Sequence, residues 1–322
     1  ALNWSAKDII ITSPITFLAT SNSIVYNGAQ PDFCDINLDN YTIDINKLED
    51  KIKFYIKKNK RVNSIIGVDY AGHPCDWESI NFLAKKYSIT LINDCCHALG
   101  SQINDNEKYA IKYADIVTHS YHPVKNITTG EGGAILTNNQ KIDKKIKLLR
   151  SHSMIKNNRT RKGGLWYYEM RDFGYNYRIT DFQCALGISQ LRKLNKFVRS
   201  RNKSAKFYDE LFQDNEIFKI PELKKNVYHS YHLYPLLIDF KKSKISKKLL
   251  FEKALKNKIR LQVHYIPIYL QKYYKDNYKF NFKNFPNSNL FYSKEVSLPI
   301  FYEIKKEQQL YVKDTLVKIL NT

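Results

Sequence analysis

The stretch Ser120-Tyr-His-Pro-Val-Lys125-Asn-Ile-Thr-Thr-Gly-Glu-Gly-Gly133 is the most informative part of this sequence. It places one lysine between an apolar run at residues 115–119 and a glycine-rich turn that leads into a second run at residues 133–137. A lysine at the end of a strand can be held rigidly and partly desolvated, which disfavours its ammonium form. The resulting nucleophile suggests Schiff-base chemistry with a carbonyl substrate or with pyridoxal phosphate. Because lysine is common in this chain, the interpretation depends on the neighbours of this one.

The composition is that of a globular protein. Hydrophobic residues make up 43% and charged residues 26% of the 322 positions, enough for a large core and two domains. The net charge of +21 suggests nucleic-acid binding as one hypothesis. However, the basic residues are spread over many segments, and there is no zinc-finger, homeodomain or RNP signature. No apolar run is as long as a membrane span, so we expect neither a nucleic-acid nor a membrane partner.

The five cysteines indicate free thiols. Cys34, Cys75, Cys95, Cys96 and Cys184 are odd in number, and their spacing matches no metal site. Free thiols are the rule in a reducing compartment. We therefore expect a cytoplasmic protein without a bound metal.

Strand and helix patterns alternate through the first half of the chain. The sequence predicts strands at residues 8–12, 23–26, 32–36, 64–70, 88–93, 115–119 and 133–137, and helices over residues 45–58, 76–87 and 141–150. The run at 88–93 does not alternate strictly between apolar and polar residues, which is typical of strands that are covered on both faces. We therefore predict an α/β fold with a mostly parallel sheet.

The second half has a different pattern. Thr180 is a predicted N-cap for a long helix over residues 181–212. Beyond it, the sequence predicts strands at 232–240 and 260–264 and helices at 246–257, 287–293 and 305–320. We divide the chain into a large domain at residues 1–185 and a second part at residues 186–322, which holds the long connecting helix and a smaller α+β domain.

The residues that follow the predicted strands form a chemically coherent set. Ligands of parallel α/β folds bind at the carboxyl ends of strands, and there this chain offers Phe17, Asp94, His97, Ser120 and Lys125. Pyridoxal phosphate needs an amine for its aldehyde, a carboxylate for its ring nitrogen, an aromatic face, and hydroxyl and N–H groups for its phosphate. Singly, these residues could equally be a helix cap, core side chains or a turn hydroxyl. Together they favour a cofactor site.

The ordered motifs resemble the DegT/StrS-type sugar-nucleotide aminotransferases, which have the aspartate aminotransferase fold type I of pyridoxal-phosphate-dependent transferases. The matching segments are residues 11–22, 68–73, 94–100, 120–133 and 174–187. The resemblance covers essentially the whole chain and implies this fold, this cofactor and transaminase activity. A histidine replaces the lysine in dehydratases of the family, so Lys125 favours transamination.

The resemblance implies a role for each candidate around the cofactor. Lys125 would form the Schiff base and move the proton between cofactor and sugar. Asp94 would pair with the ring nitrogen, and His97 would lie near the phenolic oxygen. Phe17 would stack on the ring, and Cys96 would lie near its opposite face.

Further residues are assigned to the phosphate, the partner subunit and the substrate by the same resemblance. Ser120 would bind the phosphate. Asn176 would reach the phosphate of the neighbouring subunit's cofactor, which implies a homodimer with shared active sites. His264 and Tyr265 would lie near the sugar nucleotide.

Four later segments resemble one branch of the family. They are residues 166–170, 229–235, 262–268 and 296–302. Members of this branch aminate carbon 4 of a UDP-linked 4-keto-6-deoxy-N-acetyl amino sugar in pseudaminic acid biosynthesis, with glutamate as donor and 2-oxoglutarate as the product. A different nucleotide sugar of the bacillosamine type, or a non-catalytic relative that keeps the fold for binding, are the alternatives.

The chain departs from the family pattern at its start. Relatives carry a further segment before the position of Ala1, and this segment includes a Ser/Thr-rich turn into a helix that binds the cofactor phosphate. We expect the natural protein to be longer than the sequence given.

Overall fold

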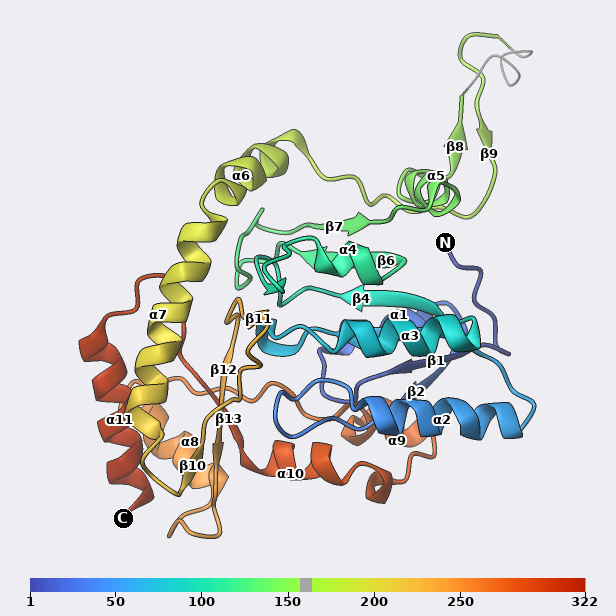
Figure 1. Cartoon of the computed structure of the whole chain (residues 1–322). Helices are drawn as coiled ribbons and strands as arrows, with labels where there is room; N and C mark the ends of the chain where they lie inside the picture. Colours follow the sequence, from blue (N-terminus) through green and yellow to red (C-terminus); the bar gives the residue numbers. More distant parts are fainter. Residues whose placement is uncertain (157–163, 322) are drawn as a thin grey trace.

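The structure is a computed structural model of the chain, and it describes residues 1–156 and 164–321. Its first half is a six-stranded sheet flanked by helices (Figure 1). The strands have the order β2-β1-β3-β4-β6-β7, and all neighbours are parallel except β6 and β7. Their bounds are β1 (Ile9–Thr12), β2 (Gln30–Phe33), β3 (Val62–Val68), β4 (Thr90–Asp94), β6 (Ile116–Ser120) and β7 (Gly133–Leu136). The predicted α/β fold with a mostly parallel sheet is confirmed.

Both faces of this sheet are buried under helices, which explains the continuous apolar strands. Successive strand residues point to opposite faces, and accordingly Ile9 and Ile11 belong to one hydrophobic cluster while Ile10 belongs to another. The first cluster includes side chains from α2, α3 and α4, and the second includes side chains from α1 and α5. The helices are α1 (Leu18–Tyr26), α2 (Ile45–Lys57), α3 (Trp77–Tyr87), α4 (Tyr109–Tyr113) and α5 (Gln140–Leu149).

The second half is built on a three-stranded antiparallel sheet with the order β10-β12-β13. Side chains of α7, α8 and α11 form its core together with the strands. The bounds are α6 (Asp181–Leu191), α7 (Leu194–Phe212), β10 (Phe218–Lys219), β12 (Tyr234–Ile238), α8 (Lys247–Lys256), α9 (Lys272–Asn277), α10 (Pro286–Lys294), β13 (Glu295–Leu298) and α11 (Lys306–Leu320). The predicted division between residues 185 and 186 falls within α6 and stays a prediction.

The two halves of the chain contact each other near one end of each sheet. Phe291 of α10 packs in a cluster with Ile15, Tyr70 and Leu237. The short strand β11 (Val227–Tyr228) pairs with β5 (Gln102–Ile103), which lies more than a hundred residues earlier in the chain. A further antiparallel pair, β8 (Met154–Ile155) with β9 (Glu169–Met170), extends away from the body (Figure 1).

Three predicted elements were wrong. Residues 23–26 lie in α1 rather than in a strand, because Ile24 packs into the cluster beneath the sheet and this tertiary contact overrides the β-branched composition. Residues 260–264 form no strand, and a single bridge joins Gln262 to Ser297 of β13. The predicted helix over 181–212 is two helices, with a break at Arg192 and Lys193.

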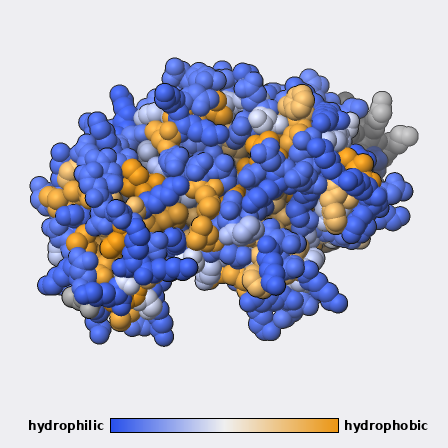
Figure 2. Space-filling model, turned by 60° about the horizontal axis from the view of Figure 1, so that its bottom comes forward, coloured by the Kyte–Doolittle hydropathy of each residue, from blue (hydrophilic) through white to orange (hydrophobic). Residues whose placement is uncertain are grey.

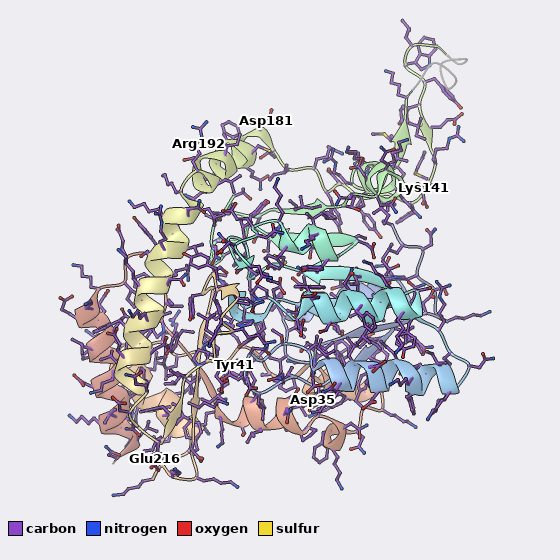
Figure 3. All side chains as sticks on the ribbon, viewed as in Figure 1. Asp35, Tyr41, Lys141, Asp181, Arg192 and Glu216 are labelled. Carbon is purple, nitrogen blue, oxygen red and sulfur yellow. The ribbon has the colours of Figure 1, made fainter. Side chains whose placement is uncertain are left out.

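The break separates two helices with different surroundings. Figure 3 labels Asp181, the first residue of α6, and Arg192, its C-cap. No residue of α6 is buried, whereas α7 packs Val198 against Gly100 and buries it in the body. Hydrophobic side chains on α6 remain exposed, among them Phe182 at 91%. On one face of the molecule, Figure 2 shows several hydrophobic patches within a mainly hydrophilic surface.

Side-chain caps begin several of the helices, and the predicted cap at Thr180 is one of them. Asp44, Asp76 and Thr180 each accept a backbone N–H in the first turn of their helices, and Gln183 completes a capping box with Thr180. In the described part of the chain, no helix combines the length and apolarity that crossing a bilayer requires.

We expect Gly67→Ala to lower the free energy of unfolding by about 1–3 kcal/mol. A methyl group at Gly67 on β3 would come within 2.6 Å of the Trp77 ring. That ring is buried and anchored by its Nε1–H, which donates to Asp69 at 2.8 Å, so it cannot yield cheaply. Urea unfolding of a double-mutant cycle with Trp77→Leu checks this cause. An equal cost of Gly67→Ala in both backgrounds would contradict it.

Candidate functional site

Asp94 is the last residue of β4 and lies at the carboxyl edge of the sheet. Its carboxylate accepts two hydrogen bonds, and a third residue supports one of the donors. Thr20 of α1 donates to Asp94 Oδ2 at 2.6 Å, and the backbone N–H of Cys96 donates to Oδ1 at 3.2 Å. The Thr16 hydroxyl lies 2.7 Å from that of Thr20 and extends the chain. Each carboxylate oxygen accepts two hydrogen bonds. Asp94 therefore has a fixed orientation and keeps capacity to accept a further donor.

Lys125 lies in the turn that follows β6, and the local backbone explains its position. Its N–H donates to the carbonyl of His122, while Tyr121 and Gly132 close the turn with a bond of 2.8 Å. A side chain at Gly133 would come within 2.5 Å of the His119 carbonyl, so the strand that leaves the turn requires glycine there. The glycines that follow Lys125 in the sequence therefore allow this turn to form.

The Lys125 amine is half-buried, and its charge is felt by the groups around it. Burial lowers the pKa of Lys125, although the negative charges of Cys96 in its thiolate form and Asp94 oppose this shift. The Lys125 charge in turn lowers the pKa of His97, His232 and His264. Within residues 1–156 and 164–321, no hydrogen bond or ion pair of Lys125 Nζ is found. The amine is therefore within electrostatic range of Asp94 and has no described hydrogen-bond partner that a ligand would need to displace.

His97 is a neutral histidine with a defined tautomer. Burial, together with Lys125 and His264, holds the pKa of His97 well below its usual range. Its Nδ1 accepts the backbone N–H of Ala71 at 3.3 Å, so the remaining proton belongs on Nε2. Nε2 lies 3.0 Å from the Tyr265 hydroxyl and donates to it. The Tyr265 proton is then available to a ligand.

Phe17 and Tyr265 bring aromatic surface to this edge. Phe17 is the N-cap residue of α1, and its ring centre lies 5.9 Å from that of Tyr265. The Phe17 side chain is 56% exposed, so its ring is accessible to a ligand rather than enclosed in the core. Stacking of a flat ligand on it is a geometry that aromatic side chains favour.

Cys96 and Ser120 lie close to the same centre, and Asn176 does not. The Cys96 Sγ points to the Thr118 carbonyl at 3.8 Å, and burial raises the pKa of this thiol, so it is a poor nucleophile. Ser120 ends β6, where its Oγ accepts the His122 N–H at 3.4 Å. Asn176 is exposed, is bridged through its backbone to Ser151, and has no contact with the other candidates in the described residues.

His264 is held from three directions. Its N–H donates to Glu295 at 3.1 Å, its Nδ1 lies 2.8 Å from the Ser297 Oγ, and its carbonyl accepts the Tyr70 hydroxyl. Burial and then the Lys125 charge lower the pKa of His264 to about 4. His264 is therefore neutral at physiological pH.

Sequence reasoning missed several members of this group. Thr20 and Ser297 lie within the segments that carried the resemblance, but nothing in their spacing signals their contacts. Thr20 is 74 positions from Asp94, and Ser297 is 33 positions from His264. Tyr70 also lies within such a segment, whereas Glu295 does not, and the contacts of both depend on how the two halves of the chain meet.

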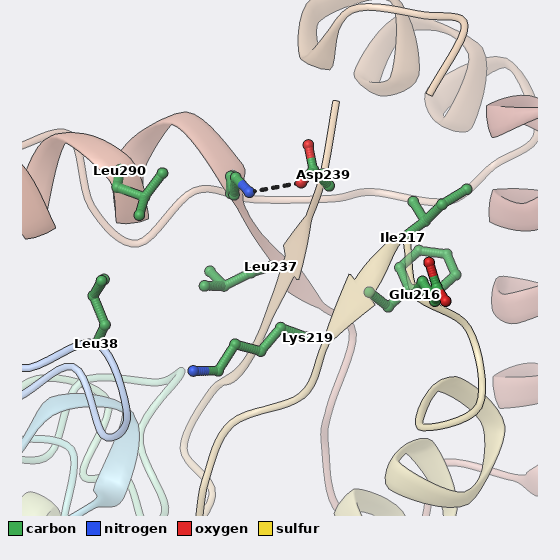
Figure 4. A pocket seen from close by; sticks show the side chains of 9 residues that line it. Leu38, Glu216, Ile217, Lys219, Leu237, Asp239 and Leu290 are labelled. Carbon is green, nitrogen blue, oxygen red and sulfur yellow. Dashed lines mark hydrogen bonds and ion pairs between the residues drawn. The ribbon is translucent and has the colours of Figure 1, made fainter. Parts of the chain in front are cut away.

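Two surface hollows lie away from these residues. One, between β10 and α10, is lined by Leu38, Leu237 and Leu290 with the Lys294–Asp239 ion pair at its rim (Figure 4). The other is lined by residues of β2, α2 and the 278–285 segment. Neither hollow is lined by a predicted site residue, so neither marks the candidate site. The described residues contain no group of three or more His, Cys, Asp or Glu placed to hold a metal.

The arrangement can hold a flat, anionic or carbonyl-bearing ligand and exchange protons with it. Lys125 offers a nucleophilic amine, and Asp94 offers a fixed acceptor. Tyr265 offers a proton that is oriented by His97. These groups come from β4, the turn after β6, α1 and the second half of the chain.

Comparisons with known proteins identify the family of this chain. The model of the DegT/DnrJ/EryC1/StrS aminotransferase family matches residues 1–317. UDP-4-amino-4,6-dideoxy-N-acetyl-beta-L-altrosamine transaminase of Campylobacter jejuni serotype O:2 is 41% identical over 314 residues, which are 98% of this chain and 80% of that protein. The Helicobacter pylori protein of the same name is 37% identical over 97% of this chain and 78% of its own length.

Solved structures give the same result. Helicobacter pylori PseC, described as an aminotransferase involved in the biosynthesis of pseudoaminic acid, superimposes with a TM-score of 0.87 at 35% identity. The match covers 98% of this chain and 80% of PseC. A Streptococcus pneumoniae protein solved in its PLP form superimposes with a TM-score of 0.85 at 25% identity, over 99% of this chain and 82% of its own.

We expect Lys125 to lose its proton at a lower pH than an ordinary lysine, because burial lowers its pKa from 10.5. Cyanate reacts only with the neutral amine, so the rate of carbamylation against pH, followed by mass spectrometry, reports the midpoint. The Asp94 charge raises the pKa of Lys125, so the midpoint should fall further in Asp94→Asn. A midpoint at the ordinary lysine value, or a rise in Asp94→Asn, would contradict this electrostatic account.

Proposed function

This chain belongs to the DegT/DnrJ/EryC1/StrS aminotransferase family, and on that premise we propose that it is a pyridoxal-phosphate-dependent sugar-nucleotide transaminase. Its substrate in this proposal is a UDP-linked 4-keto-6-deoxy-N-acetyl amino sugar of pseudaminic acid biosynthesis, aminated at carbon 4 with glutamate as donor. The names of the Campylobacter and Helicobacter relatives support this substrate. The observation that carries the proposal is a half-buried Lys125 amine, without a partner among the described residues, at the sheet edge that also holds the oriented Asp94 carboxylate.

The residues of this edge fit pyridoxal phosphate. Asp94 keeps acceptor capacity after its bonds to Thr20 and Cys96, as the protonated ring nitrogen of the cofactor requires. Phe17 leaves its ring exposed for stacking. We assign the phosphate to Ser120 and to Asn176 of a second subunit. When bound, the cofactor supplies an aldehyde that takes up the amino group and a ring that withdraws electrons from the reacting carbon.

The protein side of the chemistry rests on Lys125. Its lowered pKa makes the neutral amine more accessible than in an ordinary lysine, and this amine can attack a carbonyl and later take and return a proton at the reacting carbon. Asp94 supports the charged ring nitrogen by Coulomb attraction. His97 orients the Tyr265 hydroxyl, whose proton can stabilise negative charge on an oxygen of the ligand. Cys96, with its raised pKa, contributes shape rather than a nucleophile.

A homodimer with shared sites is part of the proposal. Asn176 contacts none of the other candidate residues within its own chain, which is what a role in the neighbouring subunit's site would require. Helix α6 buries none of its residues, and Phe182, Ile188 and Leu191 are exposed on it. Exposed apolar side chains of this kind mark protein interfaces. We further propose a cytoplasmic location, which suits free thiols and a nucleotide-sugar substrate.

A two-stage reaction tests the enzyme proposal. The protein is loaded with pyridoxal phosphate, glutamate is added to transfer its amino group, and a panel of 4-keto UDP-sugars is tested for discharge. We expect discharge by the pseudaminic acid precursor, and neither stage in Lys125→Ala. Borohydride should fix the cofactor covalently to the wild type and to the exposed-site control Lys108→Ala, but not to Lys125→Ala.

The other outcomes of this experiment separate the alternatives. Discharge by a bacillosamine-type sugar alone would change the substrate and keep the chemistry. Covalent trapping without transfer to any sugar would indicate a non-catalytic relative. Trapping in Lys125→Ala would overturn the assignment of the lysine.

The shared site predicts complementation between two inactive variants. Asn176→Asp places a negative charge beside the phosphate of the partner's cofactor and should strongly reduce activity. Lys125→Ala and Asn176→Asp subunits, exchanged by mild denaturation and refolding, form mixed dimers with one intact site. We expect the mixture to recover about a quarter of the wild-type rate in the two-stage assay. A mixture no more active than its components would contradict sharing of the site through Asn176.

A further inference from the structure

Glu295, Ser297 and His264 form a hydrogen-bonded chain that ends at the candidate site. The Ser297 hydroxyl contacts Glu295 Oε1, and His264 Nδ1 lies 2.8 Å from the Ser297 Oγ. Glu295 Oε2 also accepts a hydrogen bond from the backbone N–H of His264 at 3.1 Å. Glu295 is 0% and Ser297 4% exposed. The inner end of this hydrogen-bonded chain, at Glu295, is therefore shielded from water.

The fold explains how these three side chains meet. Glu295 and Ser297 are two positions apart on β13, so they point to the same face of that strand. Backbone bonds between Gln262 and Ser297, at 2.8 and 3.4 Å, hold the segment before His264 beside β13. The carboxylate, the hydroxyl and the imidazole are thus ordered by one strand and its neighbour.

The outer end of the chain, His264 Nε2, can be reached by a ligand. No hydrogen bond of Nε2 is found in the described residues, and it is not among the polar atoms that are sealed from solvent without a partner. The Lys125 charge lowers the pKa of His264, and the His264 charge would lower that of His97. His264 therefore lies within electrostatic range of the groups assigned to the reaction.

The direction of the chain depends on one proton. A serine hydroxyl has a single hydrogen, so Ser297 can donate either to Glu295 or to His264. If it donates to an ionised Glu295, it accepts from His264 Nδ1–H, and Nε2 carries a lone pair. If Glu295 is protonated on Oε1, it donates to Ser297, Ser297 donates to Nδ1, and the imidazole proton is on Nε2.

We propose that Glu295 and Ser297 are positioning residues that set whether His264 Nε2 accepts a hydrogen bond from the substrate or donates one to it. With Glu295 ionised, Nε2 accepts from a hydroxyl or amide N–H of the sugar nucleotide. A proton taken up at Nε2 shifts one proton from Nδ1 to Ser297 and one from Ser297 to Glu295, so it is stored on the carboxylate. His264 itself stays uncharged throughout. This inference rests on the proposed function for the identity of the ligand.

Both states of Glu295 are accessible near neutral pH. Burial raises its pKa to about 8, against the opposing effects of the Ser297 hydroxyl, the Lys247 charge and the His264 N–H. Burial also lowers the pKa of Lys247 to about 8, while the Glu295 charge opposes that shift. The other titratable groups that face Glu295 are the phenols of Tyr41, Tyr70 and Tyr265, whose pKa values are all raised by burial. They stay neutral while Glu295 titrates.

The tautomer of His264 can be measured directly. We would label the histidines of the full chain with ¹⁵N, assign His264 by comparison with His264→Gln, and follow its two ring nitrogens by NMR. In the wild type, Nδ1 should carry the proton above the Glu295 pKa of about 8, and Nε2 should carry it below that value. His264 should stay neutral through this range, since its own pKa is about 4.

Two variants should remove the pH dependence of the His264 tautomer in different ways, and a third variant is a control. In Glu295→Gln, the amide oxygen can accept the His264 N–H while the amide NH₂ donates to Ser297, so Nε2 should carry the proton at every pH. In Ser297→Ala, the link is lost and the tautomer should not follow pH. Ser293→Ala removes an exposed hydroxyl of α10 that bonds to the Leu290 carbonyl, and should behave as the wild type.

Kinetics connect the chain to the substrate. In assays above pH 8, where Glu295 of the wild type is ionised, loss of one hydrogen bond to the sugar should raise KM for the keto-sugar about tenfold in Glu295→Gln and in Ser297→Ala. The half-reaction with glutamate should change less than twofold. A wild-type tautomer that does not change with pH overturns the inference, and this titration needs no variant other than His264→Gln, which serves only for the assignment. A KM for the sugar that equals the wild-type value in both variants also overturns it.

Failure of the proposed function gives a different result. If the wild type takes no amino group from glutamate, the transaminase assignment is wrong. The NMR titration still decides whether Glu295 and Ser297 set the His264 tautomer.

Discussion

Burial of the Lys125 amine at the edge of a sheet that is covered on both faces is the constraint on which the site depends. Helices on each side exclude water from β4 and β6. The residues at the carboxyl ends of these strands therefore lie at the boundary of a low-dielectric interior. An ammonium group is disfavoured there, and Asp94 restores only part of the lost solvation. The same two-sided cover that stabilises the sheet therefore makes this one lysine chemically different from the lysines on the surface.

The positive charge of Lys125 also determines what its neighbours can do. His97, His232 and His264 are buried near it, and each has a pKa below its usual range for both reasons. Neutral imidazoles act as donors or acceptors according to their tautomer. At His97 a backbone N–H selects the tautomer, and at His264 a serine and a carboxylate do so. The site thus combines one cation with histidines whose function is set by hydrogen bonds rather than by charge.

Much of the fold followed from patterns that are local in the sequence. Continuous apolar strands, the cap at Thr180 and the glycines after Lys125 are short-range signals, and the structure agrees with each of them. The segment at 23–26 and the helix over 181–212 were predicted wrongly for the opposite reason. In the first, burial of Ile24 under the sheet outweighs β-branched composition. In the second, α7 packs on Gly100 and is buried in the body, while α6 buries none of its residues and touches the body near Thr129 and Glu131.

By itself, the sequence determined that Lys125, Asp94, His97 and Ser120 follow strands of one parallel sheet, because such strands bring their carboxyl ends to a common edge. It could not determine the hydrogen bond from Thr20 to Asp94, the contact of Tyr265 with His97, or the chain from Glu295 through Ser297 to His264. These pairings join residues between 33 and 168 positions apart, apart from the short step within β13. Only the tertiary structure decides them, because they form where helix α1 and the C-terminal half close over the sheet edge.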